Sequence, residues 1–184
     1  MRTFECDILI VPGLGNSGPD HWQTRWERQL STARRVRQAD YERPRPQPWI
    51  ETLVRAVAPA QRPVVLVAHS LGVVTIAAAA ERLAGTRVAG AFLVTPPDLD
   101  DESRRPPAID PGFAPMPRAP LPFPSVLVAS RTDPYCAYER AEDFAFAWGS
   151  ALVDAGDAGH LNTESGHGPW PEGLMRFAGL LRQL

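Results

Sequence analysis

Ser70, Asp133 and His160 are the residues whose types and order along the chain best suit nucleophilic catalysis. Serine is a weak nucleophile near neutral pH. It needs a histidine to take its proton and a carboxylate to orient that histidine. Serine, then acid, then histidine is one of the chain orders in which this triad occurs. The sequence therefore predicts acyl transfer through a covalent intermediate.

The segment around Ser70 is typical of a nucleophile elbow, which is a sharp turn between a buried strand and a helix. The apolar run Val64–Ala68 predicts the strand, and an alanine-rich helical pattern follows from Leu71. The turn needs small residues two positions before and after the serine. Gly72 meets this need, and Ala68 stands where glycine is usual. The alternative is that Ser70 only caps the helix.

The negative charge of a tetrahedral intermediate needs two hydrogen-bond donors. The Leu71 amide lies at the start of a predicted helix, where free N–H groups favour negative charge. The second donor is expected in the glycine-rich loop that follows the first predicted strand. The amide of Leu14 is the first choice in this loop, and that of Gly15 is the second.

Asp133 is the candidate acid because it follows the predicted strand Ser125–Ala129. An aspartate before a proline also suits an Asx turn or a helix cap, which is the alternative for Asp133. Three other acids follow an earlier strand and compete less well: Asp98, Asp100 and Asp101.

His160 is the candidate base because it comes soon after the predicted strand Ala151–Asp154 and is preceded by a glycine. His167 lies seven residues further along and is its main rival. Cys136 has no base assembled near it by sequence order, so we expect a small buried residue there. We expect four residues to line the substrate pocket: His21, Trp22, His69 and Pro97.

The glycine-rich loop also allows a different function. Gly13, Gly15 and Gly18 match the G-x-G-x-x-G spacing of dinucleotide sites, and Asp40 lies at about the right distance for a ribose contact. A nucleotide site would leave Ser70 without a role, so this hypothesis ranks behind the hydrolytic one. A binding protein built on a hydrolase scaffold is a further alternative, because fold does not determine function.

The composition excludes several classes of protein. All 19 cationic residues are arginine, and 21 acidic residues give a net charge of −2, which offers no reason to expect nucleic acid as a partner. The absence of lysine excludes Schiff-base chemistry. No spacing predicts a metal site, a cofactor or a membrane-spanning segment. Cys6 and Cys136 fit a reducing cytoplasm, and the oligomeric state stays open.

Strands and helices alternate along the chain and must position these residues. Strands are expected at Ile8–Val11, Val64–Ala68, Val88–Val94, Ser125–Ala129 and Ala151–Asp154, with a weaker one at Arg34–Ala39. Helices are expected at His21–Leu30, Trp49–Val57, Leu71–Leu83, Tyr138–Trp148 and Pro171–Leu184.

This pattern predicts an α/β fold in one domain of residues 1–184, a three-layer sandwich with a mostly parallel sheet and helices on both faces. The stretch Pro96–Pro124 holds ten of the twenty prolines and is not expected to be helical. We expect it to pack as an ordered loop, with a possible role as a pocket wall.

Together the motifs resemble the small α/β-hydrolases similar to retinoblastoma-binding protein 9, which include the bacterial YdeN-like proteins. The resemblance rests on Pro12–Gly15 with His21 and Trp22, on Ala68–Gly72, on Ser130–Pro134, on Gly159–Asn162 and on Gly166–Gly173. It implies a minimal hydrolase fold without a large cap, and esterase-type activity on small acyl substrates. The resemblance also implies that His160 completes the triad. The family's Leu-x-Cys-x-Glu element is not present, so no pocket-protein partner is expected.

Overall fold

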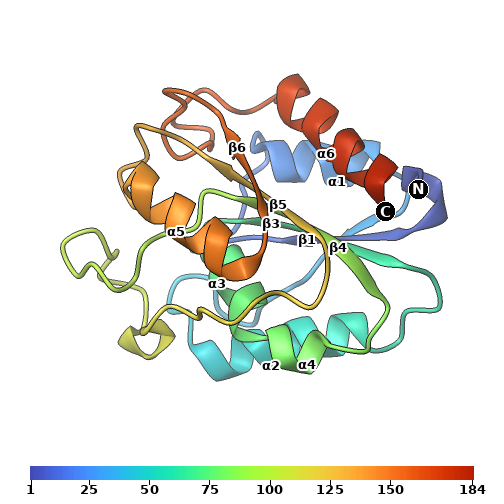
Figure 1. Cartoon of the computed structure of the whole chain (residues 1–184), viewed down its shortest axis with the longest axis horizontal. Coiled ribbons are helices and arrows are strands. Elements are labelled where there is room, and N and C mark those ends of the chain that lie inside the picture. Colours follow the sequence, from blue (N-terminus) through green and yellow to red (C-terminus); the bar gives the residue numbers. More distant parts are fainter.

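The computed structural model describes residues 1–184 and contains one sheet of six parallel strands (Figure 1). Their spatial order is β2-β1-β3-β4-β5-β6. In chain order the strands are β1 (Asp7–Val11), β2 (Ala33–Arg35), β3 (Val64–His69), β4 (Val88–Val94), β5 (Ser125–Ala129) and β6 (Ala151–Asp154). The order reverses between β1 and β3, and in open parallel sheets ligands bind at the carboxyl ends of the strands beside such a point.

Helices cover both faces of the sheet, which confirms the predicted α/β sandwich (Figure 1). The helices are α1 (Trp22–Gln29), α2 (Pro46–Val57), α3 (Leu71–Ala78), α4 (Ala80–Leu83), α5 (Tyr138–Trp148) and α6 (Pro171–Gln183). Alternate strand residues point to opposite faces. Ile8 and Ile10 therefore pack with α1 and α6, whereas Leu9 and Val11 pack with the helices of the other face.

Three elements differ by more than one residue at a boundary from those predicted. The edge strand is confined to Ala33–Arg35, and the helix expected over residues 71–83 is divided at Ala79 into α3 and α4. Helix α2 begins three residues earlier than predicted, at Pro46. Proline suits a first helical position because its missing N–H would have no partner there.

The proline-rich segment 96–124 is ordered and contains one short 3-10 helix, Pro111–Phe113. Its apolar side chains enter the larger core cluster, including those of Leu99, Ile109, Phe113, Met116, Leu121 and Phe123. Arg140 of α5 holds the start of the segment through ion pairs with Asp98 at 2.8 Å and Asp100 at 2.7 Å. The segment therefore packs as part of the domain.

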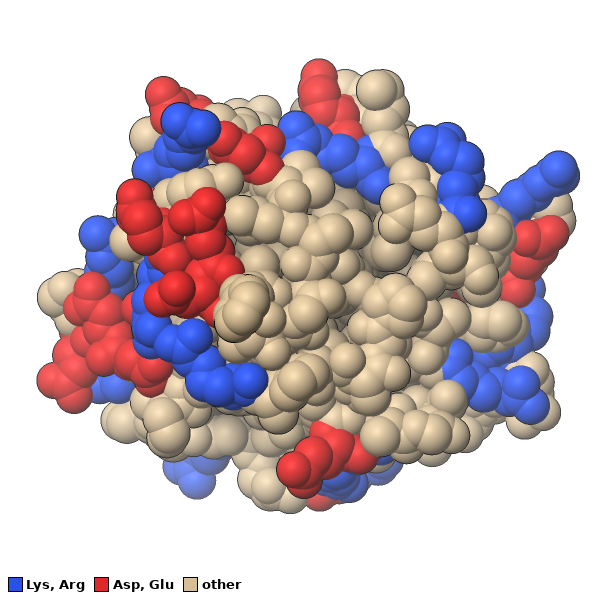
Figure 2. All heavy atoms as spheres, viewed as in Figure 1, with Lys and Arg blue, Asp and Glu red and all other residues tan.

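Charged side chains of both signs are interspersed on the face shown in Figure 2, and the centre of that face is uncharged. Acidic and arginine side chains gather at the left of this view, where α5 lies (Figures 1 and 2). None of the helices has the length and apolar character needed to cross a bilayer.

Candidate active site

A cavity of about 310 Å³ opens at the carboxyl ends of the strands. Loops that follow β1, β3, β4, β5 and β6 contribute to it, so residues that are far apart in the sequence line the same cavity. The lining residues are Leu14, Asn16, Gly18, His21, His69, Ser70, Pro97, Pro106, Ile109, Tyr135, His160, Asn162, Thr163 and Glu164.

Ser70 lies in the turn between β3 and α3 with φ 55° and ψ −127°, a conformation that residues with a side chain rarely adopt. Such strain is typical of the nucleophile elbow, because it holds the hydroxyl clear of the strand and the helix. The Ser70 side chain makes no capping hydrogen bond to α3. The alternative role of Ser70 as a simple helix cap therefore has no support in the structure.

Gly13 and Gly72 allow the loop that follows β1 (residues 12–21, the β1 loop) to approach the turn at Ser70 (the elbow) closely. A Cβ added at Gly72 would collide with the carbonyl oxygen of Val11. A Cβ added at Gly13 would lie 2.8 Å from Cβ of Ser70 and 3.1 Å from the Leu71 amide nitrogen. The β1 loop and the elbow thus pack directly on each other through their backbones.

The amides of Leu71 and Leu14 remain as candidate donors to an oxyanion. Leu71 is the first residue of α3, so its N–H has no acceptor within the helix. The Leu14 amide has no acceptor within the chain, and Leu14 lines the cavity. The Gly15 amide instead donates to the Tyr41 carbonyl at 2.9 Å, so the expectation for Gly15 is not met.

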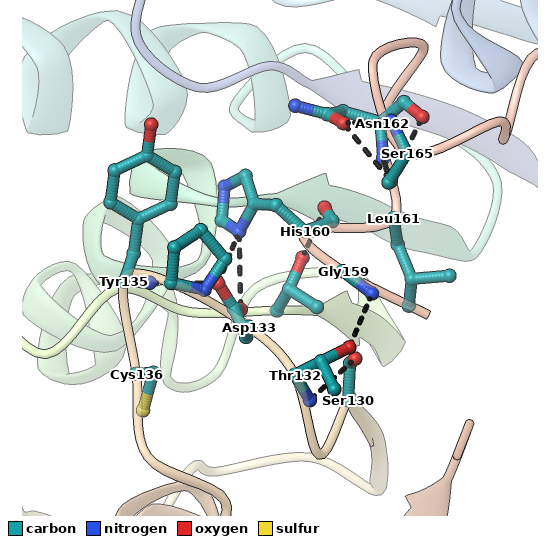
Figure 3. Close-up of polar contacts among 12 residues, drawn as sticks. Ser130, Thr132, Asp133, Tyr135, Cys136, Gly159, His160, Leu161, Asn162 and Ser165 are labelled. Carbon is teal, nitrogen blue, oxygen red and sulfur yellow. Dashed lines mark hydrogen bonds and ion pairs between the residues drawn. The ribbon is translucent and has the colours of Figure 1, made fainter. Parts of the chain in front are cut away.

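Asp133 and His160 are joined by a hydrogen bond in which His160 Nδ1 lies 2.9 Å from Asp133 Oδ1 and 3.1 Å from Oδ2 (Figure 3). Both side chains are buried. Because a carboxylate only accepts, Nδ1 carries the proton, and Nε2 is left with a lone pair. No hydrogen bond joins Ser70 to His160, although both line the cavity. Such catalytic bonds are often long before substrate binds.

Neighbouring loops position His160 through its backbone. Its carbonyl oxygen accepts hydrogen bonds from His69 Nε2 at 2.8 Å and from Thr95 Oγ1 at 3.1 Å. The Gly159 amide donates to Thr132 Oγ1 at 3.0 Å (Figure 3). This bond connects the loop after β6, which carries His160 (the histidine loop), to the loop after β5, which carries Asp133. His69 therefore lines the cavity but acts as a support for His160. Its burial lowers its pKa well below the usual range.

His21 lines the cavity as expected, and its ring is neutral. Burial, followed by the charges of Arg35 and His160, lowers the pKa of His21 to about 4. Its Nδ1 accepts a hydrogen bond from the Gln23 amide at 3.2 Å and so caps α1. With Nδ1 as an acceptor, the proton of the neutral ring is on Nε2.

Replacing His21 with asparagine will reduce the loss of stability in acid. The pKa of His21 falls from 6.5 in the unfolded chain to about 4 in the fold, so the unfolded state binds more protons between these values. The stability that depends on neutral His21 is therefore fully present above pH 6.5 and declines as the pH falls toward 4. The contribution of His21 to this decline is about 3 kcal/mol. Asparagine also caps helices but does not titrate.

Urea unfolding of wild type and His21→Asn at about pH 7.5 and about pH 4 measures this difference. The decline in unfolding free energy should be about 3 kcal/mol smaller in the variant. An equal decline in both proteins would show that His21 titrates normally in the fold.

The structure places several other predicted or competing residues away from the cavity. Trp22 does not line it: the side chain is fully buried and its Nε1 donates to the Leu161 carbonyl at 2.8 Å. It packs in the core on the face of the sheet that carries α1 and α6, with its ring 5.1 Å from that of Trp170. His167 contacts Ser165 Oγ at 3.3 Å and lies outside the cavity.

The residues on which the dinucleotide-site and cysteine-nucleophile hypotheses depend are also unsuitably placed. The Asp40 carboxylate accepts from the amides of Glu42 and Arg43 and does not line the cavity with the glycine-rich loop. Burial raises the pKa of the Cys136 thiol to about 12, which leaves it unreactive. No group of three or more His, Cys, Asp or Glu side chains is arranged to hold a metal ion.

Sequence reasoning gave no role to several residues that line or support the cavity. Tyr135 stacks edge-on against His160 with ring centroids 4.6 Å apart (Figure 3). Asn16 and Asn162 line the cavity. Thr95 and Thr132 hold the histidine loop. The one signal for them was position: each follows the carboxyl end of a strand, where the other site residues also lie.

Comparison with known proteins identifies the family of the chain. A family model described as serine hydrolase matches residues 8–179. The chain belongs to the serine hydrolase family. No curated protein matches the sequence of this hydrolase.

Solved structures place this serine hydrolase among the YdeN-like proteins. A YdeN-like hydrolase from Pectobacterium atrosepticum is 32% identical, with a TM-score of 0.83 over 97% of this chain and 91% of that one. The ydeN gene product of Bacillus subtilis is 20% identical, with a TM-score of 0.78 over 96% and 98% of the two chains. The RedJ thioesterase of Streptomyces coelicolor is 16% identical with a TM-score of 0.67, over 95% and 89%, and shares the fold.

Proposed function

We propose that this hydrolase cleaves small carboxylic esters through a triad of Ser70, His160 and Asp133. Ser70 Oγ attacks the ester carbonyl carbon while His160 Nε2 takes the hydroxyl proton, and Asp133 stabilises the imidazolium that forms. His160 then returns the proton to the alkoxide as it leaves, which yields an alcohol and an acyl-serine. Water, deprotonated by His160, attacks the acyl carbon and releases the carboxylic acid and free Ser70.

The observation that carries this proposal is the Asp133–His160 hydrogen bond at the wall of the cavity into which the Ser70 elbow opens. This bond leaves the lone pair of His160 Nε2 as the base. The amides of Leu71 and Leu14 are the donors for the oxyanion that forms on the carbonyl oxygen. These groups supply the nucleophile, the base, the orienting acid and the charge stabilisation that acyl transfer requires.

The size of the cavity supports a small substrate. Its volume of about 310 Å³ lies at the lower end of the range of roughly 300–1,000 Å³ that is usual for ligand pockets. Pro97, Pro106 and Ile109 of the proline-rich segment form one wall, and this segment is held by ion pairs to α5. The structure therefore supports short acyl groups over long lipid chains.

A fluorophosphonate probe tests this assignment directly, because it forms a covalent bond with an activated serine. We expect the wild type to be labelled and Ser70→Ala to remain unlabelled, with Ser103→Ala, at an exposed serine, as the matched control. The wild type should also hydrolyse p-nitrophenyl acetate and butyrate faster than the palmitate. Labelling that persists in Ser70→Ala would contradict the assignment of the nucleophile. An unlabelled wild type that hydrolyses no ester would favour a binding function on the hydrolase scaffold.

A further inference from the structure

The chain contains two asparagines, Asn16 and Asn162, and both line the active-site cavity. Asn16 lies in the β1 loop, just after the candidate oxyanion donor Leu14. Asn162 lies two residues after His160. The two residues therefore line the cavity from the oxyanion side and from the base side. A carboxamide offers both an acceptor and a donor, so its contacts decide which of the two faces a substrate.

The acceptor of Asn16 is already engaged. Its Oδ1 accepts from Arg35 Nη1 at 2.7 Å. Arg35 is itself held in place by an ion pair to Glu27 at 2.8 Å, and its side chain is only 10% exposed. This contact orients the carboxamide of Asn16 and leaves the Nδ2 amide without an acceptor within the chain.

Asn162 shows the same arrangement from the other side. Its Oδ1 accepts from the Ser165 amide and from Ser165 Oγ, both at 3.0 Å (Figure 3). The amide nitrogen of Asn162 points away from Ser165 in this view and has no acceptor within the chain. The turn from Asn162 to Ser165 therefore presents Nδ2 as a donor.

His21 supplies a third donor. Its Nδ1 is occupied by the Gln23 amide, so the neutral ring carries its proton on Nε2, which has no acceptor within the chain. Three N–H groups whose complementary acceptors are already used thus belong to residues that line one cavity, two on the loop after β1 and one on the loop after β6. Leaving such donors unpaired when a substrate excludes water is unfavourable, so a substrate that supplies acceptors is preferred.

The charges around the cavity restrict the kind of acceptor. Glu164 is exposed at its wall and is the one acidic or arginine residue in the lining. Its negative charge opposes a carboxylate or phosphate on the substrate, and no arginine of the lining offsets it. Tyr135 and Thr163 carry hydroxyl groups that donate or accept as needed. The matching acceptors are therefore uncharged oxygens.

We propose that Asn16, Asn162 and His21 select esters that carry uncharged acceptor oxygens, such as hydroxyl, alkoxy or keto groups, close to the scissile carbonyl. This inference rests on the proposed esterase function and specifies its substrate class. Plain alkyl esters of the same size would leave the three donors unpaired, so they are the poorer substrates.

Two esters of matched size test this preference: p-nitrophenyl methoxyacetate and p-nitrophenyl butyrate differ in one ether oxygen in place of a methylene. The measured quantity is the ratio of their kcat/KM values, compared between variants so that the intrinsic reactivity of each ester cancels. Asn162→Asp keeps the Oδ1 acceptor for Ser165 and replaces the donor with an oxygen. Asn16→Gly removes the donor and tolerates the φ of 66° at this position. We expect each change to lower the ratio by about tenfold, equivalent to one hydrogen bond.

Gln29→Glu is the matched control, since it makes the same amide-to-carboxylate change at an exposed position outside the cavity. It should leave the ratio at the wild-type value. If both asparagine variants hydrolyse the two esters with an unchanged ratio, the selectivity is wrong while the esterase function stands. If the wild type hydrolyses neither ester and is not labelled by fluorophosphonate, the function and the inference fail together.

Discussion

His160→Gln will lower kcat for p-nitrophenyl acetate by on the order of 10⁶-fold, because removal of the base from a serine triad costs about as much as removal of the whole triad. His160 Nδ1 is bonded to Asp133, and its carbonyl is held by His69 and Thr95, so the ring is positioned from both ends. Glutamine fills a similar volume but cannot take the Ser70 proton. The thermal midpoint of unfolding should stay close to that of the wild type, because the substitution leaves the fold intact.

His167→Gln provides the matched comparison, because His167 is the other histidine of the same loop. Its side chain lies outside the cavity and contacts only Ser165 among polar groups. We expect this variant to keep a kcat close to that of the wild type. Loss of activity in His167→Gln with retention in His160→Gln would reverse the assignment of the base.

Asp133→Asn will lower kcat by about 10⁴-fold while the fold remains intact. Asp133 Oδ1 also accepts from the Tyr135 amide at 3.0 Å, and the carbonyl oxygen of an asparagine can keep this bond. The NH₂ group of the new amide then faces His160 Nδ1 and converts it from a donor into an acceptor. The ring proton moves to Nε2, where it blocks acceptance of the proton from Ser70.

Steady-state kinetics with p-nitrophenyl acetate, together with a thermal melt, measure this effect. Asp157→Asn is the control, since this exposed aspartate lies in the same loop as His160 and makes no hydrogen bond through its side chain. A loss smaller than about tenfold in Asp133→Asn would mean that another group orients His160.

The sheet and the proximity of Asp133 to His160 could be predicted from the sequence because both depend on local patterns. Buried parallel strands appear as short apolar runs, and a serine between such a run and an alanine-rich helix is typical of a nucleophile elbow. The carboxyl ends of parallel strands meet at one edge of the sheet. Asp133 and His160 each follow such a strand, so their positions in the chain were enough to predict that they lie near each other.

The errors concern contacts that no local pattern reveals. Trp22 and His21 are neighbours in sequence, but the rotation of α1 sends one into the core and the other to the cavity. Gly15 lost its expected role because its amide meets the carbonyl of Tyr41, which belongs to a different segment. Asn16 lies in no motif, and Asn162 lies in one that gave it no role, so their place in the cavity appears only when the loops are brought together.

The close backbone packing at Gly13 and Gly72 has a further consequence for how the barrier to reaction is lowered. The turn that carries Ser70 and the loop that carries Leu14 pack so closely at Gly13 and Gly72 that neither position has room for a Cβ. In the proposed mechanism, this packing orients the donors of the two loops before the substrate arrives, so little reorganisation energy is spent as charge develops on the carbonyl oxygen. A side chain at either glycine would act on the activation free energy by separating the two loops, even though neither glycine contacts the substrate through a side chain of its own.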